Sequence, residues 1–427
     1  MEGQNGVHGE LMGEFEVNGA KVSGKLAVDL RNGAMQGEAG GKRIEGNTIF
    51  AETAGSSGFV LHDVTIGIQF HWERKEKQTF RGNLRLVSDS RGITIINEIG
   101  VEEYLKSVIA SEMSAESPAE LLKAHAITSR SWLVAMLDRQ KKMKNLGASQ
   151  RGLQTVGEII RWYDREDHAL FDVCADDHCQ RYQGILKIIS SAADEAVEAT
   201  RGIFLVHAGE ICDARFSKAC GGRTELFGNA WEEISVPYLQ SVSDSETEHP
   251  VPASEEEAAR WILGSPDVYC NTRDGKILKQ VLPSFDQETA DFFRWKVEYS
   301  QEEIAELLRA KSGIDFGSIL DLAPLGRGPS GRIVSLKIVG SKNTVTVGKE
   351  LEIRKWLSPS HLYSSAFVTR GEGKKGKAPA RWILEGAGWG HGVGLCQIGA
   401  AVMAVKGKSA EEIVQHYFRG AKLMKLY

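Results

Sequence analysis

The chain has 427 residues, of which 42% are hydrophobic, and a formal net charge of −5 at neutral pH. This length suffices for two or three domains, and the hydrophobic content excludes a disordered chain. The mild negative charge argues against a nucleic-acid-binding protein, which needs a broad basic face, but it permits a polysaccharide partner. No apolar run reaches the length of a transmembrane helix.

Residues 1–90 are expected to form a small β-rich domain. Glycines separate short alternating runs of apolar and polar residues, such as Lys25–Leu30 and Val64–Trp72. The N-terminal segment lacks the charged and apolar regions of a signal peptide. Residues 91–427 are then expected to form a second domain, with a polar insertion near residues 244–292.

The stretch Val101–Ala135 places a carboxylate where a helix pattern calls for an apolar residue. Leu105 and Val108 mark one helix face, and the same register leads to Glu112. The pattern then stops, so that Glu112 is expected at the end of the helix in partly apolar surroundings. Such surroundings favour the protonated form of a carboxyl group, which a general acid requires.

A second helix is predicted to begin directly after this position. Ser117 precedes a proline and Glu120, which together form the signature of a helix start with a capping box. Glu112 would therefore face this second helix. The alternative is an ordinary helix-end carboxylate, either solvated or in a salt bridge to Lys123 or Arg130.

Two histidines and two cysteines follow within twelve residues, namely His168, Cys174, His178 and Cys179. Imidazoles and thiolates suit tetrahedral zinc, and four protein ligands would make the site structural because no position is left open for water. A short disulfide between the two cysteines, or two unrelated thiols, is the alternative.

Further along, strand and helix patterns alternate. Residues 184–206 predict a strand, a helix and a strand. Helices are expected at Glu255–Leu263, Gln301–Lys311, Cys396–Val405 and Ser409–Tyr417, strands within Gly331–Arg354, and a hairpin over Ser364–Glu385. Together with the β-rich start, these patterns indicate an α+β protein.

The segment Phe216–Asp244 combines a close backbone turn with polar and aromatic residues. Gly221 and Gly222 permit the turn, after which residues 223–225 could present polar groups to a ligand. Trp231 and Tyr238 could stack on sugar rings, although aromatic residues at such positions commonly belong to the core.

A glycine-rich loop at Gly386–Ala400 carries His391 in its middle. Its spacing is neither a dinucleotide fingerprint nor a phosphate-binding loop, because histidine stands at the third glycine position and no Gly-Lys-Ser/Thr follows. The loop either lines a substrate site or simply forms a tight strand-to-helix turn. Cys396 and His391 could alternatively form a nucleophile pair, but a small thiol at the start of an apolar helix is commonly buried.

Four segments, in this order, resemble the SpoIID/LytB family: EEYLKSVIASEM–SPAELLKAHAITSRSW, DDHCQRYQG, CGGRTE…W…PYLQSV and GWGHGVGLCQIGA. They span roughly residues 90–420. Sporulation members of this family are lytic transglycosylases that act on peptidoglycan, and some relatives are amidase enhancers. The resemblance implies a SpoIID-like region with a groove between helical and β parts. It also implies that Glu112 is the catalytic acid and that the His391 loop borders the groove.

Taken with the motifs, the resemblance implies a set of substrate contacts, namely Arg130, Gly221, Gly222, Thr224, Tyr238, His391 and Gln397. The chain departs from the family at Cys220, where many relatives have histidine before the two glycines. Some relatives carry a zinc site of histidines and cysteines near residues 168–179, and here its spacing is shifted.

The implied reaction needs one carboxyl group. Glu112 would protonate the glycosidic oxygen between N-acetylmuramic acid and N-acetylglucosamine, then take the proton of the muramyl 6-hydroxyl as a 1,6-anhydro ring closes. Catalysis would need no metal or cofactor. The alternative is a non-catalytic module that binds glycan strands and assists a cell-wall amidase. Either role places the protein in the cell envelope, so an export signal or lipid anchor is expected upstream of this chain.

Overall fold

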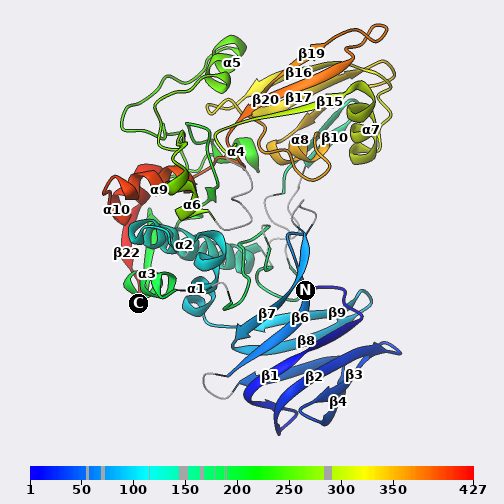
Figure 1. The fold of residues 1–427 in the computed structure, drawn as a ribbon, viewed down its shortest axis with the longest axis vertical. Helices are drawn as coiled ribbons and strands as arrows, with labels where there is room; N and C mark the ends of the chain where they lie inside the picture. The colour runs from blue at the N-terminus through cyan, green and yellow to red at the C-terminus, as the bar shows by residue number, and fades with distance from the viewer. Residues whose placement is uncertain are drawn as a thin grey trace. The chain divides into compact units, whose positions relative to one another are not determined.

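The computed structural model describes residues 1–53, 57–68, 73–114, 116–143, 152–163, 168–176, 178–186, 188, 190–282 and 291–427. Nine strands come first in the chain, and helices alternate with further strands after Val101 (Figure 1), a mixed composition that is consistent with the expected α+β class. Contacts divide the chain into two compact units: unit 1 comprises Met1–Ala115 and His168–Arg201, and unit 2 comprises Glu116–Asp167 and Gly202–Tyr427. None of the helices described here is long and apolar enough to cross a membrane.

Unit 1 is built on an antiparallel sheet in the order β4-β3-β2-β1-β5-β8-β9, with β6 paired to β1 and β7. The strands are β1 (Gly6–Val17), β2 (Ala20–Arg31), β3 (Ala34–Ala39), β4 (Lys42–Gly46), β5 (Thr48–Thr53), β6 (Gly58–Ile66), β7 (Arg74–Arg81), β8 (Asn83–Asp89) and β9 (Gly92–Glu98). The β-rich start is therefore observed. Of the expected strand Val64–Trp72, β6 contains the first three residues, and residues 69–72 lie outside the described part of the chain.

Asn-Gly turns and side-chain alternation explain why these residues form a sheet. Asn18 and Gly19 between β1 and β2 both have positive φ, at 52° and 74°, as a tight hairpin turn requires. Buried Phe15 and Val17 alternate with exposed residues at the end of β1. β9 pairs with β8 along its whole length, so the sheet continues to Glu98. The expected domain division at residue 90 stays a prediction. The two compact units are defined by contacts within the chain, and such units need not coincide with family domains.

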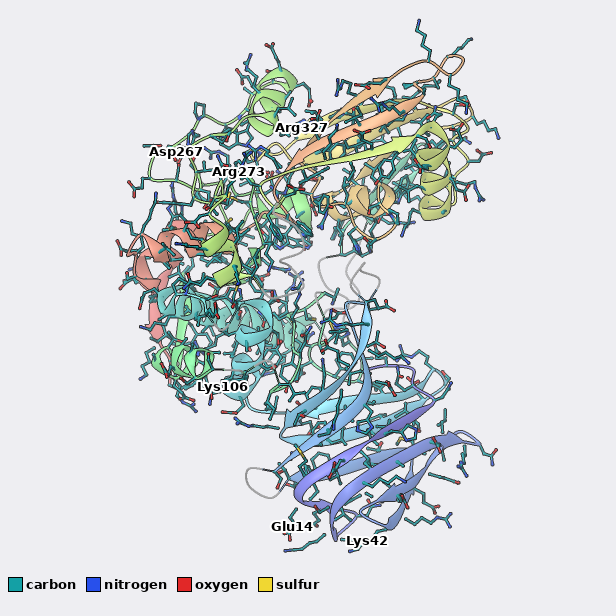
Figure 2. The ribbon with its side chains drawn as sticks, in the orientation of Figure 1. Glu14, Lys42, Lys106, Asp267, Arg273 and Arg327 are labelled. Atoms are coloured by element: carbon teal, nitrogen blue, oxygen red, sulfur yellow. The ribbon has the colours of Figure 1, made fainter. Side chains whose placement is uncertain are left out.

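Two helices complete unit 1. They are α1 (Val101–Glu112), which ends at Glu112 as expected, and α3 (Ala192–Ala199), and they lie against each other. Lys106 of α1 (labelled in Figure 2) bonds Glu103 one turn earlier and reaches Glu198 of α3 at 3.0 Å. This ion pair, partly shielded from solvent, joins the two helices.

The strand expected at the start of residues 184–206 is wrong for the residues that are described there. The amide of Ile185 donates to Thr79 of β7, and the amide of Ile188 donates back to the Ile185 carbonyl at 3.1 Å. The described residues Ile185 and Ile188 are therefore joined by a turn-type hydrogen bond, and Ile185 is joined to the sheet at Thr79. An isolated apolar run of six residues does not distinguish these possibilities by its pattern.

In unit 2, α2 (Ala119–Met143) lies against two C-terminal helices and a small sheet. These elements are α9 (Gln397–Val405), α10 (Ala410–Tyr417), β12 (Ile203–His207), β13 (Glu210–Ile211) and β22 (Lys422–Lys425). Glu120 accepts bonds from Lys123 and from the Ala410 amide, at 2.8 and 2.7 Å, instead of closing the expected capping box. It does so because it lies at the N-terminus of α10, where a carboxylate is favoured.

The remainder of unit 2 contains two sheets with helices on them (Figure 1). The first sheet comprises β10 (Gly152–Thr155), β11 (Glu158–Arg161), β18 (Thr344–Gly348), β17 (Ile333–Gly340) and β16 (Ile319–Arg327). The second comprises β15 (Arg294–Ser300), β20 (Arg381–Ala387) and β19 (Phe367–Glu372). Helix α7 (Gln301–Ser312) contributes Ile304, and helix α8 (Glu350–Trp356) contributes Trp356, to one hydrophobic core with residues of both sheets. The predicted hairpin is confirmed as β19–β20.

The polar insertion near residues 244–292 docks on this part of unit 2. It contains α5 (Glu255–Leu263) and α6 (Gly275–Val281). Ile262 of α5 is buried against Ala366 and Ala387. Arg327 (labelled in Figure 2) forms an ion pair with Glu255 at 2.8 Å. The insertion is thus an ordered part of the fold in its described residues.

Three short elements lie in the loops of unit 2 that carry the candidate residues. β14 (Phe216–Ser217) pairs in parallel with β21 (Leu395–Cys396), and α4 (Phe227–Ala230) follows the glycine pair. The pairing brings the start of the Phe216–Asp244 segment beside the end of the glycine-rich loop. Two motifs that lie about 170 residues apart in sequence therefore meet at one place.

Candidate active site

Glu112 is the last residue of α1, as the sequence predicted, and only 6% of it is exposed. The chain becomes extended at Met113, which ends the helix. One carboxylate oxygen, Oε1, accepts a hydrogen bond from the backbone amide of Arg181 at 3.1 Å. The acid predicted by the first motif is thus held by the backbone of the second motif, within unit 1.

The segment that supplies this amide runs along one face of α1. Ser111 Oγ accepts from the Gln183 amide at 3.3 Å, and Ser107 Oγ donates to the Gly184 carbonyl at 2.7 Å. The rings of Tyr104 and Tyr182 stack with their centroids 5.1 Å apart. These contacts hold residues 182–184 on α1, and they thereby position the neighbouring Arg181 amide that bonds Glu112.

Sequence reasoning missed this docking face. Tyr104, Ser107 and Ser111 are three and four residues apart, so they share one face of α1. Serines in a helix ordinarily indicate a solvent-facing surface, whereas both are buried here. The signal that could have found them is that the two serines share a helix face with Tyr104, and that a motif with glutamine and tyrosine follows later in the chain.

The four predicted metal ligands lie directly before this segment and are brought together. Their ligand atoms all lie within 4.8 Å of one another. Nε2 of His168 and Nδ1 of His178 lie 3.4 and 3.5 Å from the sulfur of Cys179. Zinc bonds of about 2.1–2.3 Å in a tetrahedron separate the ligand atoms by roughly 3.5–3.8 Å. The residues present therefore fit a single zinc ion.

The electrostatics of this cluster also suit a metal. The contact with Cys179 lowers the pKa of Cys174, burial opposes this, and the two histidines lower it further, to about 2. A thiolate is the form that binds a metal. The six cysteines are free, so the alternative of a Cys174–Cys179 disulfide is not what the structure contains.

In unit 2, the glycine pair has the backbone conformation that its residue type predicts. Gly221 and Gly222 have φ of 84° and 115°, and a Cβ at Gly222 would lie 2.8 Å from the ring of Trp261. The hydroxyl of Thr224, fully buried, donates to the Gln240 carbonyl and accepts from a backbone amide. Tyr238 accepts a bond from the Asp213 amide at 2.9 Å. These polar groups are engaged inside the fold, and their contact with a glycan stays a prediction.

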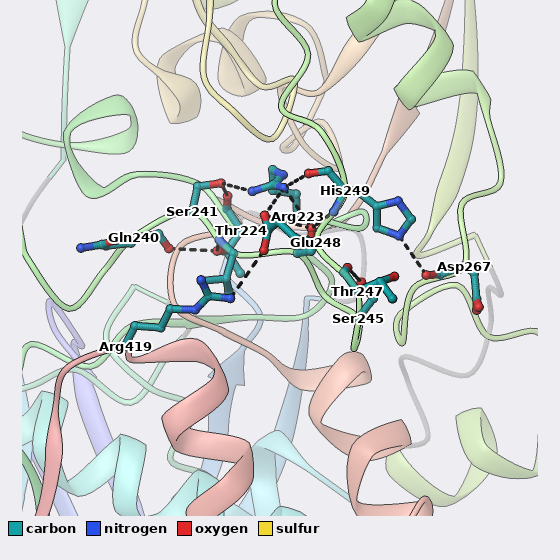
Figure 3. A network of polar contacts seen from close by, with 12 residues as sticks. Arg223, Thr224, Gln240, Ser241, Ser245, Thr247, Glu248, His249, Asp267 and Arg419 are labelled. Carbon is teal, nitrogen blue, oxygen red and sulfur yellow. Dashed lines mark hydrogen bonds and ion pairs between the residues drawn. The ribbon is translucent and has the colours of Figure 1, made fainter.

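Arg223 is also engaged inside the fold (Figure 3). It is 2% exposed and donates to Ser243 at 2.9 Å, to Glu248 and to the carbonyl of His249. Glu248 in turn lies 3.5 Å from Arg419. The network joins the segment after the glycine pair to the start of the polar insertion, so this arginine orders loops rather than presenting its charge to solvent.

His391 has a neutral imidazole in a cationic neighbourhood. Burial, and then the charges of Arg215 and two further arginines, hold its pKa well below the ordinary value. Nδ1 accepts a bond from the Val393 amide at 3.0 Å, which assigns the proton to Nε2. The ring lies 4.7 Å from that of Trp231, on which the Arg215 guanidinium stacks. A bond to the backbone of Phe216 also engages this imidazole within the fold, so its contact with a glycan stays a prediction.

The remaining candidates of unit 2 lie in its interior. Arg130 is fully buried and donates to the Ile203 carbonyl at 3.2 Å. Gln397 is 2% exposed and its amide lies 2.9 Å from Nε2 of His125. Cys396 is fully buried and its sulfur accepts the Gly399 amide at the start of α9. The burial argues against Cys396 as a nucleophile, and glycan contacts of the other two stay predictions.

Comparison with known families identifies two regions of the chain. Residues 89–207 match the family described as stage II sporulation protein, SpoIID. Residues 225–394 match a domain of unknown function, DUF8618. The first match contains Glu112 and all four residues of the His/Cys cluster, and the second contains His391.

Three relatives extend the comparison. An uncharacterized protein of Brachyspira hyodysenteriae is 26% identical over 93% of this chain and 82% of its own length. Stage II sporulation protein D of Bacillus amyloliquefaciens is 26% identical over 77% of this chain and 75% of its own length. The amidase enhancer of Bacillus subtilis is 26% identical over 55% of this chain but only 33% of its own length.

The SpoIID match over residues 89–207 and the relatives named stage II sporulation protein D and amidase enhancer support a member of the SpoIID/LytB family.

Proposed function

We propose that this chain is a peptidoglycan lytic transglycosylase with Glu112 as its single general acid and base. The bond cleaved joins N-acetylmuramic acid to N-acetylglucosamine in glycan strands. The observation that carries the proposal is the position of Glu112, a carboxyl at the end of α1 that the Arg181 amide holds. Membership of the SpoIID/LytB family supports it.

The proposed reaction uses Glu112 twice. In its protonated form it gives a proton to the glycosidic oxygen while the C1–O bond breaks. The 6-hydroxyl of the same muramyl residue attacks C1, and the Glu112 carboxylate takes up the hydroxyl proton. A 1,6-anhydro ring results, no water is consumed, and Glu112 returns to its starting form. A second carboxylate, which hydrolytic glycosidases usually employ, is not required.

The His/Cys cluster would act through structure rather than through chemistry. A zinc ion held by His168, Cys174, His178 and Cys179 would cross-link the loop that precedes Arg181. All four ligand positions would be filled by the protein, so the ion would have no open position for water. The proposed role of these residues is to hold the Arg181 amide where Glu112 needs it.

A second candidate function rests on the similarity to the amidase enhancer of Bacillus subtilis. In that case the chain would bind glycan strands and assist a cell-wall amidase, and Glu112 would contact the glycan without cleaving it. Both candidates place the chain in the cell envelope with peptidoglycan as its partner. Neither requires a nucleic acid.

The products formed from peptide-free glycan strands, in water enriched in oxygen-18, distinguish these functions. We expect new anhydromuramyl ends that carry no oxygen-18, detected by mass spectrometry. Ends that carry oxygen-18 would identify a hydrolase and contradict the proposal. Strands that remain intact while the protein sediments with them would favour the amidase-enhancer function.

A further inference from the structure

Unit 2 contains a second cluster of metal-ligand side chains, which the proposed reaction does not use. The sulfurs of Cys220, Cys270 and Cys396 and a carboxylate oxygen of Asp244 all lie within 4.8 Å of one another. Each of the four residues is at most 1% exposed. The cysteines are spread over more than 170 residues of sequence, so no spacing motif announces the cluster.

The distance between two of the sulfurs is the one that a shared metal ion imposes. Sγ of Cys220 and Sγ of Cys270 are 3.7 Å apart. Two sulfurs bound to one tetrahedral zinc at 2.3 Å are separated by roughly 3.8 Å, whereas a disulfide requires about 2.05 Å. The geometry therefore matches two ligands of one ion and not a covalent bond.

The third sulfur, Sγ of Cys396, accepts hydrogen bonds from the backbone. The backbone amides of Cys220 and Gly399 point at Sγ of Cys396, at 3.2 and 3.4 Å. Cys396 is also the N-cap residue of α9. Backbone amides and a helix N-terminus both stabilise a thiolate, which is the form in which cysteine binds a metal.

Asp244 brings a carboxylate into the same interior without a cation to pair with it. Its oxygens accept from the Tyr417 hydroxyl at 2.6 Å and the Cys270 amide at 2.7 Å. Among the residues that the structure describes, no lysine, arginine or histidine forms an ion pair with it. An ionised carboxylate in a protein interior needs a compensating positive charge, and a divalent ion supplies it.

The backbone around the cluster is shaped to let these groups meet. A Cβ at Gly399 would lie 2.2 Å from Asp244, so only glycine permits the carboxylate to approach the start of α9. One buried and one partly buried guanidinium group complete the surroundings. Arg332 donates to the Cys220 carbonyl at 2.9 Å, and Arg294 donates to the Gly221 carbonyl at 3.1 Å. Their charges offset part of the excess negative charge of three thiolates and a carboxylate.

We propose that Cys220, Asp244, Cys270 and Cys396 bind one tetrahedral zinc ion as a closed structural site. The ion would join three loops of unit 2: the one that contains the glycine pair, the polar insertion, and the end of the glycine-rich loop. It would thereby hold the His391 loop against the Gly221 turn. Three soft sulfur ligands and one carboxylate favour zinc over magnesium or calcium.

Metal content of the purified full-length chain tests this site independently of enzyme activity. We expect about two zinc ions per chain by plasma mass spectrometry, one in each cluster. Cys270→Ser should lower the content to about one. The double variant Cys174→Ser/Cys179→Ser should also retain about one. Cys212→Ser is the matched control, because Cys212 is equally buried, free and outside both clusters, and its zinc content should be unchanged.

A measurement on folded protein covers the case in which Cys270→Ser fails to fold. The Cys174→Ser/Cys179→Ser variant, reloaded with cobalt(II), should show a sulfur-to-cobalt charge-transfer absorption, because three thiolates would remain as ligands. The proposal is overturned if this variant holds no metal. It is equally overturned if its intact mass is lower by two hydrogens, as a Cys220–Cys270 disulfide would make it. Iron in place of zinc would overturn the choice of metal.

Discussion

His125 is a single buried base that makes the stability of the folded protein depend on pH. It is fully buried in unit 2 and lies between Gln397 and Ser129, at 2.9 and 3.2 Å. Burial, with a smaller effect of Lys218, lowers the pKa of His125 to about 3. The folded protein therefore keeps this imidazole neutral at a pH where the unfolded chain protonates it.

This difference predicts a loss of stability in mild acid. Because the unfolded state binds more protons below pH 6.5, the contribution of His125 is complete above that pH and declines as the pH falls toward 3. At pH 5 the decline amounts to about 2 kcal/mol. Urea unfolding of the wild type and of His125→Gln at pH 7.5 and pH 5.0 measures it. The variant should lose about 2 kcal/mol less between the two pH values, and equal losses would refute the argument.

Glu112 illustrates what single residues reveal in the sequence. The helix register placed it at the end of α1, and that position is confirmed. Its bond to the Arg181 amide could not be predicted, since any residue type offers a backbone amide. Arg130 and Thr224, which the motifs and the family resemblance imply as substrate contacts, are both buried and bonded within the fold, and their contact with a glycan stays a prediction.

At the scale of elements, the His/Cys loop is expected to control the order of the segment that docks on α1. Cys174→Ser, or removal of zinc by a chelator, should release the cross-link before Arg181. The amides of residues 180–184 should then exchange with solvent at least about tenfold faster, which corresponds to about 1.4 kcal/mol. Hydrogen exchange read by mass spectrometry measures this directly. Unchanged exchange in Cys174→Ser, or an equal increase in Cys212→Ser, would contradict it.

Most helices of the described chain could be predicted because they carry local start signals. The capping box of Ser300 and Glu303 begins α7, and that of Ser409 and Glu412 begins α10, both as expected. α8 was not predicted, because its N-cap residue, Lys349, makes no side-chain capping hydrogen bond. The strand expected at the start of residues 184–206 was wrong for the converse reason, since the described residue Ile185 makes a tertiary bond to Thr79 of β7 that no local pattern reveals.

The two candidate metal sites also differ in how far the sequence reveals them. The ligands of the His/Cys cluster fall within twelve residues, so the sequence predicted the set that the structure brings together. The cluster of Cys220, Asp244, Cys270 and Cys396 has no local signature, since tertiary structure alone assembles it. Sequence spacing reveals sites on one loop and conceals sites that several loops share.

At the scale of the whole molecule, the chain combines a family region with further structure. The SpoIID match covers residues 89–207, and the DUF8618 match covers residues 225–394. The sheet of β1–β8 lies almost entirely before the first match. Because the carboxyl that the proposed function depends on lies inside the SpoIID match, the central claim can be tested on the full chain by one substitution.

Glu112→Gln provides that test on peptide-free glycan strands, with anhydromuramyl ends counted by mass spectrometry. The amide retains the shape of the carboxyl group but cannot give and take a proton. Release should fall by about a hundredfold to ten-thousandfold, while the variant still sediments with the strands. Glu102→Gln is the matched control, because Glu102 is a 7% exposed carboxylate of the same helix, and it should release anhydro ends at a rate near that of the wild type. Undiminished release by Glu112→Gln would contradict the assignment of Glu112 as the general acid and base.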